Sequence, residues 1–371
     1  MKALYIAFQP LVDCSGISKK IYAQYEALKK CGLEIKICNQ KIVNGYLCYT
    51  IDGEKIIDKL GSGMKAHLGL YYRYNGIQQY ILDNNIKFVY IRYIHIANPL
   101  FLLFLRRLHN NGIKIFLEIP TYPYDGEVKN GSCIKRFQMF IERHSRRFFH
   151  YYVDRIVTFS RDESIFRIPT VRISNGLDMD QVPCKKQVSH QGFRLICVAM
   201  FKEWHGLDRL IEGLRHYYRD TPVGKEVYLT VVGDGDSYFQ TCRELVNSYS
   251  LTKYVSFVGV KSGAELDELF DLSDLAVGCL ACHRKNIYEV LSLKNVEYAA
   301  RGIPFVYSEN NRDFDQREYV YRVAPDESPI NIESLIRFVD EFSISSESIR
   351  ASVESDLSWY GQMQKVCSAI N

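Results

Sequence analysis

The sequence predicts an α/β protein built from two doubly wound domains that face a central cleft, and three observations carry this prediction. Short runs of β-branched and aromatic residues alternate with longer amphipathic stretches, which is the pattern of parallel strands joined by crossover helices. The alternation restarts once, after a polar stretch at 183–191 that has no periodicity and is typical of a linker. The length of 371 residues suffices for two domains with hydrophobic cores of their own.

Ten segments have the length and composition of buried strands, and six longer segments have helical periodicity. The segment 44–64 is ambiguous and can hold a small hairpin. The predicted strands span 3–8, 34–38, 88–92, 114–118, 155–159, 194–199, 227–232, 255–260, 275–280 and 304–307. The predicted helices span 18–30, 99–110, 207–218, 238–249, 264–272 and 293–301.

The linker places the first Rossmann-like domain at 1–187 and the second at 188–354.

Composition argues against some classes of function. A net charge of +4 does not favour a nucleic-acid partner, for which a strongly basic domain is expected. The N-terminus lacks the long apolar core of a signal peptide, and the longest apolar run, 99–105, is far shorter than a membrane span. We therefore expect a cytoplasmic protein.

Eleven cysteines are scattered along the chain, and only Cys279 and Cys282 form a close pair. With His283 they make C-x-x-C-H, the spacing of a c-type haem attachment site. No second C-x-x-C completes a zinc site. Buried apolar thiols in a reducing compartment are the simpler interpretation. A haem protein remains the rival, and a Soret band in the purified protein would reveal it.

The stretch 288–307 carries the main chemical signal. Ser292 is a good N-cap residue, Gly302 suits the position just after a helix, and Pro304 opens the next strand. A helix N-terminus offers free backbone N–H groups and a positive dipole end, which suit a phosphate. Glu289 and Glu297 frame this helix start, and a carboxylate is a good acceptor for two vicinal ribose hydroxyls.

Seven residues separate Glu289 from Glu297, and this E-x7-E arrangement resembles that of the retaining GT-B glycosyltransferases of family 4, the group 1 transferases. The family's stretch reads like E-x-x-x-x-K-x-x-E-[YA]-x-A-x-G-x-P-[FV]-V, and this chain has it from Glu289 to Val306. Other segments match in order. They are V-V-G-D-G at 231–235, V-S-F-V-G at 255–259, I-S-N-G-L-D at 173–178 and W-H-G-L-D-R-L-I at 204–211, the last resembling members that assemble polysaccharides.

The resemblance implies that the second domain binds a nucleotide sugar and that the last helix, at about 355–371, packs back on the first domain. Glu297 would hold the ribose, the N–H groups near Ser292 and Leu293 the diphosphate, and Glu289 hydroxyls of the donor sugar. The candidate catalytic residues are Glu289, Lys202 and Lys294, and the donor-binding candidates are Glu297, Ser292, Leu293, His205, Arg284, Lys285, Val260 and Gly235. Solvated helix glutamates are the alternative for Glu289 and Glu297.

The chain departs from the family pattern at one place. Where the commoner pattern has an Arg and a Lys that contact the diphosphate, this chain has Met200 and His205. Other cations must then offset the phosphate charge, with Lys202, Arg284, Lys285 and Lys294 as candidates. Plain surface charge is the alternative for Lys202.

The acceptor is expected on the first domain, where loops at the carboxyl ends of the strands line the predicted cleft. Gly16 lies between the first strand and the first helix, and a tight turn is its alternative role. Glu118 at the end of the strand 114–118, and Tyr122 and Asp125 in the loop after it, are acceptor-contact candidates. Loop packing is the alternative role of the aromatic residues. Many family members have a histidine near here, and this chain does not.

The segment 135–150 combines basic residues and phenylalanines at helical spacing. Such a basic amphipathic helix can lie on an anionic membrane surface, whereas a core-facing helix with a solvated basic face is the alternative. Three D-x-D pairs, at 178–180, 234–236 and 313–315, resemble metal-binding pairs of other transferases. The first two fit structural turns, so neither a metal nor another cofactor is expected.

The resemblance therefore implies a retaining hexosyl-type glycosyltransferase that moves a sugar from a nucleotide diphosphate sugar to a hydroxyl of a lipid-linked glycan. Surface polysaccharide synthesis, such as capsule or O-antigen, is the implied setting, with peripheral attachment to the inner face of the cytoplasmic membrane. The rival is a non-catalytic GT-B partner that binds a sugar nucleotide or another transferase. The residues Met200 and His205 keep this rival open.

Overall fold

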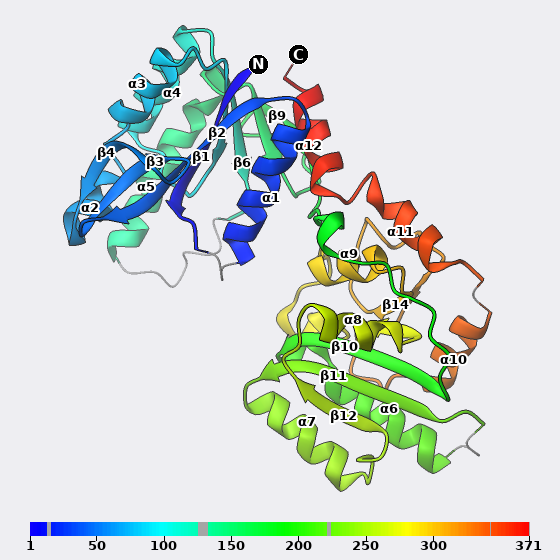
Figure 1. The fold of residues 1–371 in the computed structure, drawn as a ribbon. Helices are drawn as coiled ribbons and strands as arrows, with labels where there is room; N and C mark the ends of the chain where they lie inside the picture. Colours follow the sequence, from blue (N-terminus) through cyan, green and yellow to red (C-terminus); the bar gives the residue numbers. More distant parts are fainter. Residues whose placement is uncertain (13–15, 125–132, 221–223, 342, 371) are drawn as a thin grey trace. The chain divides into compact units, whose positions relative to one another are not determined.

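The computed structural model describes residues 1–12, 16–124, 133–220, 224–341 and 343–370. The chain forms two compact units (Figure 1). The N-terminal unit comprises Met1–Ser174 together with Trp359–Asn371, and the C-terminal unit comprises Asn175–Ser358. Each unit is built around one sheet, so the predicted α/β fold class with two Rossmann-like domains is confirmed.

The sheet of the N-terminal unit has the strand order β4-β3-β2-β1-β5-β6-β7-β9-β8. In the middle of this order, β2, β1, β5, β6, β7 and β9 pair in parallel. At one edge, β3 and β4 add an antiparallel hairpin, which lies within the segment 44–64 that the sequence left ambiguous. A short antiparallel β8 closes the other edge. The bounds are β1 Lys2–Pro10, β2 Glu34–Val43, β3 Tyr46–Ile51, β4 Lys55–Gly61, β5 Phe88–Arg92, β6 Lys114–Ile119, β7 Arg155–Thr158, β8 Ser164–Ile165 and β9 Ile168–Arg172.

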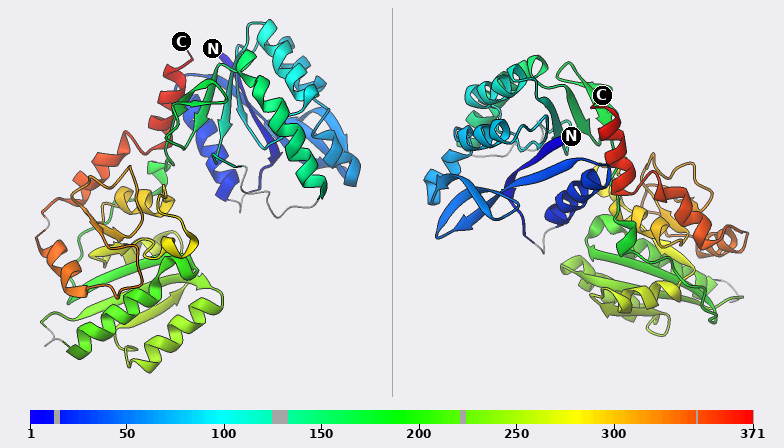
Figure 2. Two further views of the ribbon diagram at one scale, coloured as in Figure 1. Left: turned by 180° about the vertical axis from the view of Figure 1, so that it is seen from behind. Right: turned by 45° about the horizontal axis from the view of Figure 1, so that its top comes forward.

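Alternate residues of β1 point to opposite faces of the sheet and join different hydrophobic clusters. Leu4 and Ile6 pack with helices α3 and α4, whereas Tyr5 packs with α1 and α12. Figures 1 and 2 show the helices of this unit on both faces of its sheet. Both faces are therefore covered, as expected of a doubly wound sheet. The helices of this unit are α1 Gly16–Lys30, α2 Gly63–Gly69, α3 Asn75–Asp83, α4 Pro99–Asn110, α5 Cys133–Ser145, the 3-10 helix η2 Arg146–Tyr151, and α12 Trp359–Ser368.

The sheet of the C-terminal unit has the order β12-β11-β10-β13-β14-β15, and all of these strands pair in parallel. Leu195 of β10 packs toward α6, α7 and α10, and its neighbour Ile196 packs toward α8, α9 and α11. The strands are β10 Phe193–Phe201, β11 Val227–Gly235, β12 Val255–Gly259, β13 Leu275–Val277, β14 Phe305–Tyr307 and β15 Val320–Arg322. The helices are η3 Met179–Gln181, η4 Glu203–His205, α6 Leu207–Asp220, α7 Ser237–Ser248, α8 Ala264–Asp271, η5 Cys282–Lys285, α9 Leu293–Ala300, α10 Ile332–Asp340 and α11 Ser346–Glu354.

The chain passes from one unit to the other at 174/175, whereas the sequence placed the boundary at 187/188. The intervening residues belong to the C-terminal unit because they pack on it. Met179 and Val182 join its hydrophobic cluster, and the amide of Leu177 donates to the carbonyl of Leu357 at 2.9 Å. The polar stretch at 183–191 has no regular structure, and the amide of Lys185 donates to the carbonyl of Arg301 at 2.7 Å.

Helix α12 ends the chain and is part of the N-terminal unit. Trp359 and Met363 bury their side chains in the cluster that also contains residues of β1 and α1. The side-chain carbonyl of Gln362 accepts a hydrogen bond from the amide of Ser174 at 2.7 Å. The observed helix is shorter than the predicted 355–371. Across the part of the chain that the structure describes, no helix is long and apolar enough to cross a membrane.

Candidate functional site

The strand order of the C-terminal unit reverses between β10 and β13. From β10 the chain continues to β11 and β12 on one side and then returns to β13 on the other. In open α/β sheets, ligands bind outside the carboxyl ends of the strands at such a switch point. Here the segments 202–206, after β10, and 278–292, after β13, lie at these ends. Most of the donor-site candidates lie in these two segments or in α9, which follows them.

Two backbone hydrogen bonds hold these segments together. The amides of Leu280 and Ala281 donate to the carbonyls of His205 and Trp204, both at 3.1 Å. Gly206 has φ +65°, and a Cβ atom there would lie 2.8 Å from Cβ of Leu280. Only glycine combines this left-handed backbone with such a close approach.

His205 is buried and electrically neutral at physiological pH. Its Nδ1 accepts a hydrogen bond from the amide of Lys202 at 2.9 Å. Burial, and after it the charge of Lys294, lower the pKa of His205 to about 3. His205 therefore cannot supply the positive charge that the family pattern has at this position. Met200, the other departure, is 64% exposed.

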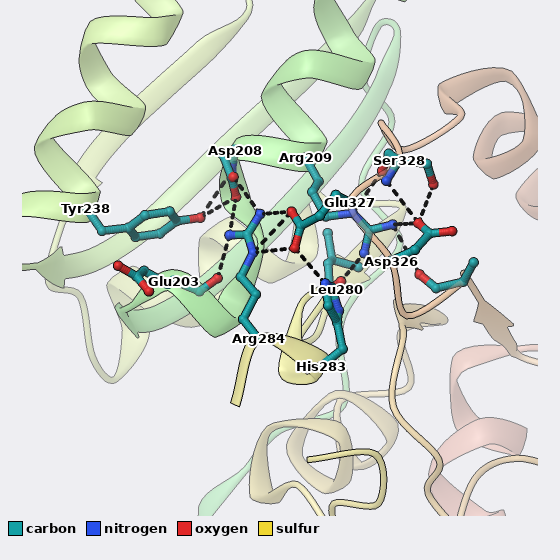
Figure 3. A network of polar contacts seen from close by, with 11 residues as sticks. Glu203, Asp208, Arg209, Tyr238, Leu280, His283, Arg284, Asp326, Glu327 and Ser328 are labelled. Atoms are coloured by element: carbon teal, nitrogen blue, oxygen red, sulfur yellow. Dashed lines mark hydrogen bonds and ion pairs between the residues drawn. The ribbon is translucent and has the colours of Figure 1, made fainter. Parts of the chain in front are cut away.

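Three of the candidate cations already have partners. Lys202 pairs with Asp236 at 2.6 Å, and the ammonium of Lys285 lies 3.1 Å from the centroid of the Trp204 ring. Arg284 is held between two carboxylates: it donates to both oxygens of Asp208, at 2.8 and 3.1 Å, and also pairs with Glu327 (Figure 3). These two carboxylates already compensate the charge of Arg284.

Arg284 and Arg209 form the centre of a polar network (Figure 3). Arg209 is 3% exposed and donates to the carbonyls of Leu280, Ala324 and Ser328, and to the carboxylate of Asp326. The network ties the first turn of α6 to the segment after β13 and to the loop at 324–328. Its two arginines therefore hold the shape of the site.

Helix α9 begins and ends where the sequence predicts. Ser292 is the N-cap residue, and Gly302, with φ +72°, follows the C-cap. The hydroxyl of Ser292 makes no capping hydrogen bond, so it does not occupy the N–H groups of the first turn. Lys294 lies in this turn; within the described part of the chain, its buried ammonium has no hydrogen-bond partner. Leu293, next to it, is half exposed.

Glu289 and Glu297 lie on either side of this helix start. Glu289 is exposed, and two backbone hydrogen bonds join its segment to Asn310. The amide of Val290 donates to the carbonyl of Asn310 at 3.0 Å, and the amide of Asn310 donates to the carbonyl of Tyr288 at 2.7 Å. The side chain of Glu297 is 33% exposed, and its Oε1 accepts a hydrogen bond from Arg301 at 3.1 Å.

Sequence reasoning missed three buried polar residues near this helix. Glu309 follows β14 and is 1% exposed, and Asn295 and Asn311 are fully buried. Both carboxylate oxygens of Glu309, the whole amide of Asn295 and Nδ2 of Asn311 have no hydrogen-bond partner among the described residues. Burial, and after it the neighbouring Cys279, raise the pKa of Glu309 to about 8. A carboxylate in the loop after the predicted strand 304–307 was the available signal for Glu309.

Sequence comparison shows a similarity of the unit that holds this site to a known family. Residues 192–337 match the sequence profile of the family described as "Glycosyl transferases group 1". This match lies within the C-terminal unit. A search of curated protein sequences gave no match.

Solved structures extend the likeness to the whole fold. A glycosyltransferase from Rickettsia africae is 12% identical, with a TM-score of 0.66 over 100% of this chain and 97% of that one. Anabaena HepE in complex with UDP is 12% identical, with a TM-score of 0.62 over 100% and 99%. The lipopolysaccharide outer core galactosyltransferase WaaB is 14% identical, with a TM-score of 0.60 over 100% and 99%. The fold is therefore that of the GT-B glycosyltransferases.

Two further donor-site candidates lie on the β11 and β12 side of the C-terminal unit. Gly235 ends β11, and Val260, directly after β12, is 70% exposed. One aspartate in each of two D-x-D pairs has a structural role. Asp236 caps α7 by accepting from the amide of Tyr238 at 3.1 Å, and Asp178 caps η3. Within the described ranges, no group of three or more His, Cys, Asp or Glu side chains is arranged to hold a metal ion.

The acceptor candidates lie in the N-terminal unit. Gly16 is the first residue of α1, and Asp125 lies outside the described residues. Tyr122 is half-buried and packs edge-on against Phe166. Glu118 is fully buried, and its two oxygens accept hydrogen bonds from Tyr90 and Arg92. Glu118 therefore lies within the core of its unit, where both of its oxygens are already used.

Proposed function

We propose that this protein is a retaining glycosyltransferase that moves a sugar from a nucleoside diphosphate sugar to a hydroxyl of a lipid-linked glycan. The match of residues 192–337 to the family "Glycosyl transferases group 1" supports glycosyl transfer in general. The observation that carries the proposal is the start of α9 at the switch point, with Glu289 and Glu297 on either side of it. Anabaena HepE, which has the same fold, is described in complex with UDP, and this favours a uridine nucleotide as the first donor to try.

In this proposal the diphosphate lies against the N–H groups of the first turn of α9. The ammonium of Lys294 belongs to the same turn and compensates part of the diphosphate charge, whereas Lys202, Arg284 and Lys285 have partners elsewhere. Glu297 accepts from the ribose hydroxyls, and Glu289 accepts from hydroxyls of the donor sugar.

Retention follows from reaction on one face of the donor sugar. The bond from the anomeric carbon to the diphosphate oxygen breaks through an oxocarbenium-like state, and the acceptor hydroxyl attacks from the side that the diphosphate leaves. The departing phosphate oxygen takes the proton of that hydroxyl. Such a path needs no enzymatic nucleophile, and stabilising the departing diphosphate is its main requirement.

Glu297→Ala should weaken binding of the nucleoside diphosphate about 10-fold to 100-fold, since a hydrogen bond to a charged group contributes about 1.5–3 kcal/mol. Isothermal titration with UDP measures this directly. Glu265→Ala is the matched control, because Glu265 is an exposed glutamate of α8 in the same unit that pairs with Lys261. Equal affinities of the Glu297 variant and the wild type would remove the ribose role from Glu297.

Transfer itself is tested by release of nucleoside diphosphate from a panel of sugar nucleotides in the presence of glycan lipid extracts. We expect release that depends on the extract and that is lost in Glu289→Ala. A donor that binds but is not turned over with any extract would instead favour the non-catalytic GT-B partner. Neutral His205 and exposed Met200, in place of two cations, are the observations that support this second function.

The lipid-linked acceptor is supported by the outer face of α5 and η2. Met139, Glu142 and Phe149 face the core, and the hydroxyls of Tyr93 and Tyr124 donate to the carboxylate of Glu142 at 2.7 and 2.6 Å. The opposite face carries aromatic side chains that are 50–63% exposed, interspersed with exposed arginines. These residues are Phe137, Phe140, Phe148, Tyr151, Arg136, Arg143 and Arg147. Such a face suits an anionic membrane surface, and peripheral attachment to the inner leaflet completes the proposal.

Phe137→Ser with Phe140→Ser should reduce binding to vesicles that contain phosphatidylglycerol about 10-fold or more, because the two rings are 63% and 58% exposed and would enter the interface. Sedimentation with vesicles measures the bound fraction. Leu100→Ser with Leu103→Ser on α4 removes similarly exposed apolar side chains and should leave binding unchanged. Equal losses in the two double variants would contradict a specific membrane face.

A further inference from the structure

The strand order of the N-terminal unit also reverses, between β1 and β5. From β1 the chain continues to β2, β3 and β4 on one side and then returns to β5 on the other side. Both β2 and β5 pair with β1 in parallel, so the carboxyl ends of β1 and β5 lie at the same edge of the sheet. Ligands of open α/β sheets bind outside such ends. The segment 93–98, between β5 and α4, therefore lies where a ligand of this unit is expected.

His95 has a strained backbone in this segment. Its φ is +60°, in the left-handed region that is unfavourable for residues with a side chain. Hydrogen bonds on either side of it hold the segment. The amide of Ala97 donates to the hydroxyl of Tyr93 at 3.1 Å. Nδ2 of Asn98 donates to the carbonyl of Ile96 at 2.9 Å. Strained residues that the surrounding structure holds in place concentrate at functional sites.

The ring of His95 is stacked on the ring of Tyr124, which belongs to the loop after β6. The two ring centroids are 3.9 Å apart, and the ring planes make an angle of 23°. The rings of Tyr93 and His95 make an edge-to-face contact, with centroids 5.8 Å apart. Tyr93 and Tyr124 are each 1% exposed, whereas His95 is half-buried. The imidazole therefore lies between a buried aromatic cluster and solvent.

A buried carboxylate on α5 fixes both tyrosines. Oε1 of Glu142 accepts hydrogen bonds from the hydroxyls of Tyr93 and Tyr124, at 2.7 and 2.6 Å. Oε2 of Glu142, a residue that is 1% exposed, accepts from Arg146 at 3.1 Å. The guanidinium of Arg146 also lies 5.0 Å from the centroid of the Tyr124 ring. Side chains from three parts of the chain thus support the imidazole, and such support is typical of a preorganised functional group.

An imidazole suits the hydroxyl groups of a sugar as ligands. One ring nitrogen of a neutral histidine donates a hydrogen bond and the other accepts one, and a hydroxyl group can do both. Two contacts, from Glu142 to Tyr124 and from Tyr124 to His95, connect the imidazole to α5. The outer face of α5 is the face proposed above to lie on the membrane. A sugar attached to a lipid of that surface is therefore the ligand that fits this position.

We propose, on the basis of the glycosyl transfer proposed above, that His95 is an acceptor-binding residue. Its imidazole hydrogen-bonds a hydroxyl of the acceptor sugar and orients that sugar for transfer. Tyr93, Tyr124 and Glu142 are positioning residues that act through His95. The departing phosphate oxygen takes the proton of the attacking hydroxyl, as in the proposed function, so His95 moves no proton.

His95→Gly removes the imidazole and keeps the backbone, because glycine adopts a positive φ without strain. The concentration of glycan lipid extract that gives half-maximal release of nucleoside diphosphate should rise about 10-fold, since a hydrogen bond to the acceptor is lost. The affinity for UDP, measured by isothermal titration, should stay the same. An unchanged half-saturating concentration would overturn the proposal, and so would an equal loss of UDP affinity.

Two further variants separate the side chain from the backbone. His95→Asn keeps a hydrogen-bonding group and tolerates the left-handed conformation, so its effect should be smaller than that of His95→Gly. Asn85→Gly is the matched control. Asn85 has φ +53° in the turn before β5, at the opposite end of that strand, and its replacement should leave the half-saturating concentration unchanged. Thermal unfolding verifies that each variant is folded before its kinetics are compared.

A second measurement on the full chain needs no turnover. Diethyl pyrocarbonate modifies imidazole rings, and the tryptic peptide 93–106 contains His95 as its only histidine. A saturating concentration of glycan lipid extract should suppress the modification of His95, whereas UDP should not. His216 of the C-terminal unit, whose side chain is 44% exposed, is the reference and should react at the same rate throughout.

This measurement also separates a failure of the inference from a failure of the proposed function. If the wild type releases no nucleoside diphosphate with any extract, the proposed transfer fails, and the modification rates still decide whether His95 binds the glycan. Equal rates for His95 with and without the extract contradict that role. A His95 that the reagent does not reach in the free protein contradicts it as well, because its imidazole is then closed to a ligand.

Discussion

Arg209→Met should lower the free energy of unfolding of the C-terminal unit by about 3–5 kcal/mol, since each buried acceptor left without a partner costs about 1–3 kcal/mol. The side chain is 3% exposed, and it donates to three backbone carbonyls of segments far apart in the sequence. Methionine fills a similar volume without a donor. The loss should therefore arise from unsatisfied carbonyl groups rather than from a cavity.

The same substitution should disturb the candidate site. Leu280 lies in the segment 278–292 that follows β13; its carbonyl accepts from Arg209, and its amide donates to the carbonyl of His205. Without Arg209 the segment that leads to α9 loses one of its attachments to α6. We therefore expect weaker UDP binding together with the lower stability.

The chain offers a clean reporter for this measurement, because it has only two tryptophans. Trp204 lies in the C-terminal unit and Trp359 in the N-terminal unit. In a Trp359→Phe background, tryptophan fluorescence during denaturation in urea follows the C-terminal unit alone. Arg215→Met is the matched control, because Arg215 lies on the same helix in a partly exposed pair with Glu212. It should change stability by less than about 1 kcal/mol. Equal effects of the two variants would mean that the buried network adds little.

Periodicity and caps were sufficient to predict much of the fold. Strand β5 and helix α4 have the predicted bounds, the latter because the side chain of Asn98 caps the helix and Pro99 occupies its first position. The predicted alternation of parallel strands and helices did not predict the edge strands of the N-terminal sheet. The hairpin of β3 and β4 extends the first sheet with antiparallel strands, whose mixed exposure gives no clear alternation. Strand β13 ends at Val277 rather than at residue 280, since the chain bends toward η5.

The candidate site was predictable only in part, because pairing of charges is a long-range property. The sequence made Arg284 a candidate cation for the diphosphate. In the structure it pairs with Asp208 and Glu327, which lie 76 and 43 residues away along the chain. Lys202 meets Asp236 across 34 residues. By contrast, the start and end of α9 depend on neighbouring residues and were found correctly. The start and end of a helix could be recognised from neighbouring residues in the sequence. Which cations remain available for a ligand could not, because their partners lie far away along the chain.

Arg92→Met should lower the stability of the N-terminal unit by about 3–5 kcal/mol, because it leaves a buried carboxylate without its cation. Arg92 ends β5 and lies directly opposite Glu118 of β6 in the sheet register. The two side chains are 6% and 0% exposed and form an ion pair. Tyr90 donates to the other oxygen of Glu118 at 2.7 Å. A single remaining hydrogen bond does not replace the charge of the arginine.

Fluorescence of Trp359 in a Trp204→Phe background measures this unit. Lys29→Met, which breaks the exposed pair with Glu26 on α1, is the control and should have an effect below about 1 kcal/mol. Arg92→Met combined with Glu118→Gln should recover most of the stability, since the neutral amide still accepts from Tyr90 and needs no counter-ion. The double variant also decides between the two roles of Glu118. If it is stable and transfers sugar normally, Glu118 is structural. If it is stable but its KM for the acceptor rises, the acceptor role predicted from the sequence stands.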